Sequence, residues 1–178
     1  LVPDLIGMGE SGKSGDGAYR FADHARYLDA WFDAVGVVGE AVIVGHDWGG
    51  ALGMNWANRH RDRVRGIAYM ETFVAPVAWD DWPDAARGVF QAMRSEAGEE
   101  LVLEKNVFVE RILPGSVLRD LTDVEMTVYR RPFTQAGENR RPTLVWPREI
   151  PMEGEPADVV ALVEDYAAWL SSCDLPKL

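Results

Sequence analysis

Residues Ala41 to Gly50 read AVIVGHDWGG, and this stretch decides the fold that we expect. Ala41 to Val44 are consecutive apolar residues, which is typical of a strand buried on both faces of a parallel sheet. The residues from Gly45 to Gly49 then have the form G-x-nucleophile-x-G, with Asp47 at the nucleophile position. The pattern predicts a sharp strand-to-helix turn that presents the Asp47 carboxylate. The alternative is that Asp47 only caps the following helix, a common role for aspartate.

The segments on either side complete a strand–helix–strand pattern. Apolar residues spaced by four, three, four and three predict a helix over residues 21–35. Residues 50–60 have a helical pattern, and Gly66 to Met70 read as a second buried strand. A strand, a helix and a strand within about 30 residues make a βαβ unit, and such units build parallel sheets. We also expect a strand end at residues 1–6 and a strand start at residues 175–178.

The alternation of strands and helices stops after Thr72. Residues 76–145 hold many aromatic side chains and helix-like segments such as residues 84–97. The sequence from Thr122 to Glu125 is a capping box, which predicts the start of a further helix. We interpret this region as a mostly helical insertion that lies over the sheet.

These patterns predict an α/β fold with a mostly parallel sheet, helices on both faces and a helical cap. We expect a partial core over residues 1–75, the cap over residues 76–147, and a return to the core over residues 148–178. A stretch marked by prolines, Pro142 to Pro156, would lead out of the cap. Pro156 suits the first position of a helix that runs to about Ser172.

Residues Gly7 to Ser14 read GMGESGKS and match G-x-x-x-x-G-K-[ST], the phosphate-binding loop of many nucleotide hydrolases. Such a loop needs a helix that starts at its Lys-Ser pair, so that main-chain amides face the phosphate. Here Gly15-Asp16-Gly17 follows, and two glycines in three residues oppose a helix. Glu10 adds negative charge where phosphate would lie. We therefore interpret GMGESGKS as a surface loop.

The composition limits the possible partners. The 178 residues contain 18 Lys and Arg against 29 Asp and Glu, a net charge of −11. This charge argues against nucleic acid and anionic membranes as partners. Cys173 is the single cysteine, which excludes a disulfide framework and a cysteine-based metal site. Because the chain starts without Met, on an apolar run at Leu1, we expect an internal piece of a longer protein.

A carboxylate at a nucleophile elbow predicts one kind of chemistry. Asp47 can attack an electrophilic carbon and form an ester, which activated water then hydrolyses. This suits an sp³ carbon with a leaving group, such as an alkyl halide or an epoxide. The Trp48 indole N–H donates without accepting, so it is suited to stabilising a departing halide, with core packing as the alternative. Gly45 and Gly49 would let the chain segments at the elbow pass each other.

Glu71 directly follows the second strand. A right-handed crossover puts the carboxyl ends of both strands at the same edge of the sheet, so we expect Glu71 close to Asp47. There it would orient a catalytic histidine, whereas the alternative is a solvent-exposed loop acid. The base is assigned to none of the histidines. The His46 side chain should point away from Asp47, and His24 and His60 lie on predicted helices.

The chain resembles the haloalkane dehalogenases of the α/β-hydrolase fold over its full length. The resemblance lies in Asp4 to Gly9, the elbow Gly45 to Gly50, Ile67 to Glu71, and Pro142 to Arg148. It is closest to the subfamily that carries its catalytic acid after the sixth strand.

The resemblance implies a role for each candidate residue. Asp47 would be the nucleophile, Glu71 the acid, and Trp48 one of two halide-stabilising residues. An apolar pocket between core and cap would be lined by Trp82, Phe90, Phe108, Trp146 and Pro147. The second halide-binding residue and the base histidine would lie outside this chain, so we expect that this chain alone does not turn over substrate. The implied reaction is cofactor-free and metal-free hydrolysis of a small apolar haloalkane to an alcohol and a halide ion.

Three other functions stay open. Epoxide hydrolases share the H-D-W-G-G elbow but use two cap tyrosines, and Tyr129 is the only clear tyrosine of the expected cap. A luciferase shares the scaffold and the acidic nucleophile, which would make the protein a light-emitting monooxygenase. Outside the enzymes, the chain would be a catalytically incomplete piece or a binding module. We expect a monomer in the cytoplasm, with the periplasm as the alternative compartment.

Overall fold

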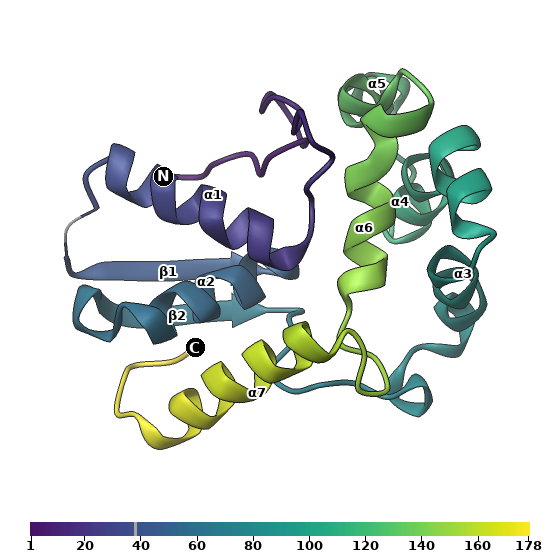
Figure 1. Cartoon of the computed structure of the whole chain (residues 1–178). Coiled ribbons are helices and arrows are strands. Elements are labelled where there is room, and N and C mark those ends of the chain that lie inside the picture. Colours follow the sequence, from purple (N-terminus) through teal and green to yellow (C-terminus); the bar gives the residue numbers. More distant parts are fainter. Residues whose placement is uncertain (38) are drawn as a thin grey trace. The chain divides into compact units, whose positions relative to one another are not determined.

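The computed structural model describes residues 1–37 and 39–178, which form two compact units (Figure 1). Unit 1 consists of Leu1–Arg20 and Pro83–Arg148, and unit 2 consists of Phe21–Trp82 and Glu149–Leu178. The structure thus groups the first twenty residues with the helical region, whereas the sequence placed them in the core. The boundaries at residues 75 and 147 stay a prediction about domains.

Unit 2 is built on the predicted βαβ unit. The strands β1 (Ala41–His46) and β2 (Val64–Met70) pair in parallel, and the helix α2 (Trp48–Arg59) connects them. The helix α1 (Phe21–Ala34) precedes β1, and the helix α7 (Ala157–Ser172) lies near the end of the chain. Each of these elements was predicted, although α7 begins one residue after Pro156. Two short 3₁₀ turns complete the unit, η1 (Arg61–Arg63) and η2 (Trp79–Asp81).

The predicted strand start at the end of the chain is confirmed as a parallel bridge to β2. The Ile67 N–H donates to the Pro176 carbonyl at 2.9 Å, and the Leu178 N–H donates to the Ile67 carbonyl at 3.0 Å. The strand end predicted at residues 1–6 is wrong, because those residues have no strand conformation. Apolar character alone does not make a strand, since a strand also needs a hydrogen-bonded neighbour.

The two faces of the sheet differ in exposure. Ile43 is buried, and a Cβ added to Gly53 of α2 would lie only 2.6 Å from the Ile43 side chain. Val42 and Val44 alternate with Ile43 and are 64% and 69% exposed. The prediction that this strand is buried on both faces is therefore wrong for the chain described here. Helix α2 covers one face of the pair, and it also contacts α1 and α7 (Figure 1).

Unit 1 is helical in all its regular elements. Its α-helices are α3 (Asp84–Arg94), α4 (Leu113–Gly115), α5 (Asp123–Arg130) and α6 (Arg141–Glu149), the last of which ends on the first residue of the returning unit 2 segment. Two π-helical segments, η3 (Glu100–Glu104) and η4 (Phe108–Ile112), and two 3₁₀ turns, η5 (Arg131–Phe133) and η6 (Gly137–Arg140), connect them. Its core includes a cluster of buried apolar side chains, those of Met93, Val102, Leu103 and Leu144.

Two predictions about this region have definite outcomes. The capping box is confirmed, because the Thr122 hydroxyl accepts the Glu125 N–H at 3.3 Å and the Glu125 carboxylate accepts the Thr122 N–H at 2.8 Å. The stretch predicted to lead out of the cap, Pro142 to Pro156, begins within α6, and unit 1 ends at Arg148. Pro142 lies in the first helical turn, where no amide partner is lost, and Pro147 lies close to the end of the helix.

Candidate functional site

Asp47 lies at the turn between β1 and α2 in a strained backbone conformation. Its φ and ψ are 51° and −129°, a region that residues with a Cβ rarely adopt. Hydrogen bonds of the main chain hold this conformation. The Asp47 N–H donates to the Met70 carbonyl at 3.2 Å, and the Asp47 carbonyl accepts from the Gly50 N–H at 2.9 Å, from the Ala51 N–H at 3.3 Å and from the Thr72 hydroxyl at 2.7 Å. This is the geometry expected of a nucleophile elbow.

The alternative role of Asp47 as a helix cap does not match the structure. Asp47 occupies the N-cap position of α2, but its side chain makes no capping hydrogen bond there. The carboxylate thus does not accept the amide of the second or third helical residue, as a capping aspartate would. It is available for chemistry at the end of the strand.

Close backbone approach at the elbow requires glycine at Gly45 and Gly50. A Cβ added to Gly45 would lie 2.5 Å from the Gly50 Cα, and one added to Gly50 would lie 2.5 Å from the Thr72 hydroxyl oxygen. A Cβ added to Gly49 would meet no atom within 4 Å. The expected role of Gly49 in letting the chain pass is therefore wrong, and Gly50 takes that role.

The environment of Asp47 makes its carboxyl group harder to ionise. Asp47 as a residue is exposed, but the atoms packed around its carboxyl displace water, and this desolvation raises the pKa of the carboxyl above its ordinary value. The positive charge of His46 and a hydrogen bond from the Trp48 amide act in the opposite direction and lower that pKa. A partly desolvated carboxylate is also a stronger nucleophile than one fully surrounded by water.

Glu71 lies beside Asp47 at the carboxyl edge of the sheet. His46 pairs with Met70 in the parallel register, and Asp47 and Glu71 are the first residues after the two strands. Glu71 shares the positive φ of its neighbour, at 49°. The expected proximity of the two residues along the sheet edge thus follows from the observed register, while the catalytic role of Glu71 stays a prediction.

The indole of Trp48 is buried against two phenylalanine rings. Its ring centroid lies 5.9 Å from that of Phe21 and 5.0 Å from that of Phe73, with interplanar angles of 55° and 56°. Both contacts have the tilted geometry that aromatic pairs favour. Neither phenylalanine was singled out from the sequence, because contacts between α1, the elbow and the segment after β2 leave no periodic signal.

The histidines occupy three different environments. His24 is fully buried on α1. His60 stacks on Trp56, with ring centroids 4.7 Å apart, and its Nε2 lies 3.7 Å from the Asp29 carboxylate. His46 is exposed at the end of β1 and acts on Asp47 through its charge. These positions give no reason to assign the base to any of the three.

The expected pocket residues fall into both units. Trp82 belongs to unit 2 and makes an edge contact with Trp79 at 6.4 Å. Within unit 1, Phe90 and Phe108 pack partly buried on the apolar cluster, while Trp146 and Pro147 are buried on α6. A shared pocket lined by all five residues stays a prediction.

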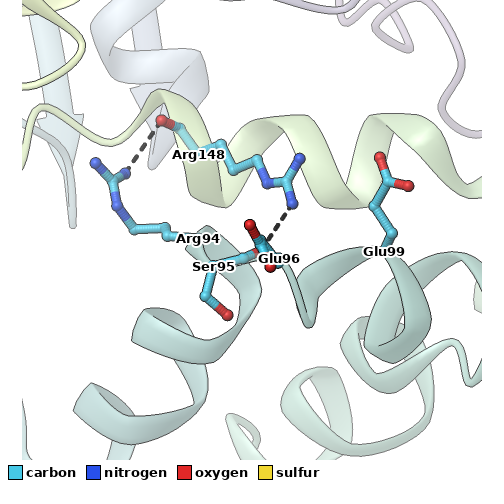
Figure 2. A pocket seen from close by; sticks show the side chains of 5 residues that line it. All are labelled: Arg94, Ser95, Glu96, Glu99 and Arg148. Carbon is cyan, nitrogen blue, oxygen red and sulfur yellow. Dashed lines mark hydrogen bonds between the residues drawn. The ribbon is translucent and has the colours of Figure 1, made fainter.

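A polar cavity of about 560 Å³ opens within unit 1 and was not expected from the sequence (Figure 2). Its lining consists of Arg94, Ser95, Glu96, Glu99 and Arg148. Both arginines donate to main-chain carbonyls at its wall, and Glu99 pairs with Arg141 at 3.0 Å. The one signal in the sequence was an arginine in the last turn of each of two helices, a position that suits carbonyl capping.

The loop that matches a phosphate-binding motif does not have the matching structure. Residues Ser14 to Gly17 are not helical, and the next helix begins at Phe21. The Lys13 ammonium donates to the Gly7 carbonyl at 2.6 Å and lies 4.5 Å from the centre of the Phe133 ring. The lysine thus serves packing within unit 1, in agreement with the interpretation of GMGESGKS as a loop.

Among the helices formed by residues 1–37 and 39–178, none is long and apolar enough to span a membrane. This result concerns the described helices alone.

Comparisons with known proteins agree with the elbow and the fold. A curated haloalkane dehalogenase of Sphingobium indicum is 58% identical over 181 residues, which cover 100% of this chain and 61% of that protein. Coelenterazine h 2-monooxygenase of Renilla reniformis is 46% identical over 100% of this chain and 58% of its own length. The crystal structure of a haloalkane dehalogenase from Bradyrhizobium elkani is 47% identical with a TM-score of 0.93, over 98% of this chain and 60% of that one.

The chain thus spans about three fifths of the length of these relatives. The sequence model of the family described as alpha/beta hydrolase fold matches residues 1–147. That match includes β1, the elbow at Asp47, β2 and Glu71, the elements from which the site is built. The chain belongs to the α/β-hydrolase fold family.

Proposed function

We propose that the whole protein hydrolyses haloalkanes to an alcohol and a halide ion. The observation that carries the proposal is the strained Asp47 at the strand-to-helix turn, with Glu71 directly after the neighbouring strand β2. The similarity to proteins named haloalkane dehalogenase supports it. The substrate class is a small apolar molecule with a carbon–halogen bond.

The first step would be a displacement at carbon. A carboxylate oxygen of Asp47 attacks the sp³ carbon that carries the halogen, a C–O bond forms, and the carbon–halogen bond breaks with its electron pair on the halide. The Trp48 indole N–H, whose ring Phe21 and Phe73 hold, donates a hydrogen bond to the leaving halide. The product is an alkyl ester of Asp47.

The second step would release the alcohol. Water adds to the carbonyl carbon of the ester while a base removes one of its protons, and the base returns that proton to the departing alkoxide, which leaves as the alcohol. The Asp47 carboxyl group then loses its proton to water, which regenerates the carboxylate. Glu71 orients that base. We assign the base to a histidine other than His24, His46 and His60, in line with their environments.

The experiment is halide release from 1-bromobutane by the whole protein, beside an Asp47→Asn variant. We expect release by the unaltered protein and none by the variant, and mass spectrometry should find a butyl adduct on Asp47 when turnover is stopped early. Turnover of styrene oxide without halide release would favour an epoxide hydrolase instead. Inactivity on both substrates, in a folded protein, would leave a non-catalytic role.

A light-emitting monooxygenase is the second candidate. The observation in its favour is the 46% identity to coelenterazine h 2-monooxygenase. Light emission from coelenterazine, measured beside halide release on the same preparation, separates the two activities. We expect halide release without light, because the elbow chemistry derived above needs no oxygen. The monomeric state and the cytoplasmic location stay predictions.

A further inference from the structure

We propose that Glu149 and Tyr166 are positioning residues that hold the Trp48 indole in place. This inference rests on the proposed role of Trp48 as a halide-stabilising donor. Neither residue would touch the substrate. Each would act through the main chain of one of the two phenylalanines that contact Trp48.

The position of the indole depends on these two rings. Trp48 is the first residue of α2, so its own backbone is fixed by the elbow, but its side chain turns about two further bonds. The contacts with Phe21 and Phe73 limit that rotation, since both rings lie within 6 Å of the indole at similar tilts. A shift of either ring would therefore change where the indole N–H points.

Glu149 anchors the ring of Phe21. Phe21 is the first residue of α1, and its N–H is one of the amides that a helix start leaves without a partner. The Glu149 Oε2 accepts that N–H at 2.9 Å, from 128 residues further along the chain. Glu149 is 4% exposed, so water does not compete for this contact. A negative group at a helix N-terminus is also favoured by the helix dipole.

Tyr166 anchors the ring of Phe73. Its hydroxyl donates a hydrogen bond to the Phe73 carbonyl, which lies in the irregular segment after β2. Tyr166 is fully buried on α7, and burial raises the pKa of its hydroxyl, so that the proton stays available for donation. A buried carbonyl outside regular structure needs such a partner.

The two anchors share an origin. Glu149 and Tyr166 both belong to the segment Glu149–Leu178, which returns to unit 2 after the helical region. That segment would thus hold both aromatic neighbours of Trp48, namely Phe21, which precedes the elbow in the chain, and Phe73, which follows it. A displacement of the order of 1 Å at a reacting group can cost about a hundredfold in rate, so small changes at either anchor should be measurable.

The test uses the whole protein labelled with 5-fluorotryptophan and the variants Glu149→Ala and Tyr166→Phe. The Trp48 signal in the ¹⁹F spectrum is identified by its loss in Trp48→Phe, and sodium bromide is titrated. We expect both variants to shift the Trp48 signal and to weaken bromide binding by about five- to tenfold, as suits the loss of one buried hydrogen bond. Glu149→Gln, which keeps an acceptor oxygen, should stay within about twofold of the unaltered protein.

Asn58→Ala is the matched control. Asn58 is a buried polar residue of the same unit, bonded to Asp165 at 2.6 Å, and it lies about 15 Å along α2 from Trp48. The Asn58→Ala variant should have a lower melting temperature, with the Trp48 signal and the affinity for bromide unchanged. An equal loss of bromide affinity in Asn58→Ala would overturn the proposal, because a general loosening would then explain the effect.

The remaining outcomes separate this proposal from the proposed function. An unmoved Trp48 signal in Glu149→Ala and Tyr166→Phe would overturn the positioning role, whatever the activity. If bromide moves no Trp48 signal in the unaltered protein, the halide role of Trp48 is contradicted. The positions of the signal in the two variants would still decide whether Glu149 and Tyr166 place the indole.

Discussion

Arg94 and Arg148 each donate hydrogen bonds to main-chain carbonyls at the end of the helix that carries the other. The Arg94 guanidinium donates to the carbonyls of Pro147 at 2.8 Å and of Arg148 at 3.1 Å. The Arg148 guanidinium donates to the carbonyl of Met93 at 3.1 Å. It also donates to the carbonyl of Ser95 at 3.0 Å (Figure 2). The exchange satisfies carbonyls that helix ends leave free, and it joins α3 to α6 within unit 1.

We predict that Arg148→Ala lowers the free energy of unfolding by about 1–3 kcal/mol, because the Met93 and Ser95 carbonyls lose a charged donor. Arg148→Lys should recover only part of it, since an ammonium cannot reach two carbonyls in the fork geometry of a guanidinium. Arg65→Ala is the control: Arg65 forms an exposed pair with Glu40, whose loss should cost less than about 1 kcal/mol. Urea unfolding of the whole protein measures the free energy of unfolding of the three variants. Equal losses in Arg148→Ala and Arg65→Ala would show that the hydrogen bonds of Arg148 to the main-chain carbonyls do not stabilise the fold.

Gly45 and Gly49 should respond in opposite ways to alanine. A methyl group on Gly45 would overlap the backbone of α2, so Gly45→Ala should cost about 3 kcal/mol or leave no folded protein. A methyl group on Gly49 meets open space at a helical position, so Gly49→Ala should be neutral or stabilising by up to about 1 kcal/mol. Thermal unfolding of both variants decides the matter, and a large loss at Gly49 would disprove the steric account.

Thr72 should matter for catalysis through the backbone of Asp47. Its hydroxyl donates to the Asp47 carbonyl at 2.7 Å, which helps to hold the strained turn. Thr72→Val keeps the shape and removes the donor, so kcat for 1-bromobutane should fall by about tenfold. Thr72→Ser keeps the hydroxyl and should retain most of the rate. Similar losses in both variants would show that the methyl group of Thr72, and not its hydrogen bond, is what the elbow needs.

The acid limb of the reaction should report the raised pKa of Asp47. The carboxylate is the reactive form, so the rate of ester formation should rise with pH through the folded pKa, which lies above the ordinary 3.8. His46→Asn removes a charge that lowers this pKa, so the limb should move to higher pH. A single-turnover pH profile of both proteins tests this, and a limb that moves to lower pH would contradict it.

The same shift predicts a pH dependence of stability. Between the ordinary pKa of 3.8 and the raised folded pKa, the native Asp47 binds more protons than the unfolded chain, so its ionisation lowers stability as pH rises through that window. Asp47→Asn cannot ionise, and its free energy of unfolding should exceed that of the unaltered protein at neutral pH. Urea titrations at several pH values measure the difference, which should shrink below that window.

The local elements were predictable because each depends on neighbours in sequence. The apolar run of Ala41 to Val44, the capping box at Thr122 and the glycine at Gly45 each have a signal within a few residues. The helix α6 was not predicted, although Pro142 lies in its first turn, where proline is tolerated. The strand expected at residues 1–6 failed since pairing is not a local property.

The amino-acid sequence was enough to predict the βαβ unit, the sharp strand-to-helix turn at Asp47 and the placement of Glu71 at the same edge of the sheet. The spacing of the apolar residues and the right-handed crossover between parallel strands are enough for these conclusions. The contacts of Phe21 and Phe73 with Trp48 became visible only in the folded structure. The same holds for the hydrogen bonds from the Phe21 amide to Glu149 and from Tyr166 to the Phe73 carbonyl. It also holds for the hydrogen bonds that Arg94 and Arg148 donate to carbonyls at the end of each other's helix. The physical reason is distance along the chain: these contacts join residues tens of positions apart, whose meeting depends on how the helices pack.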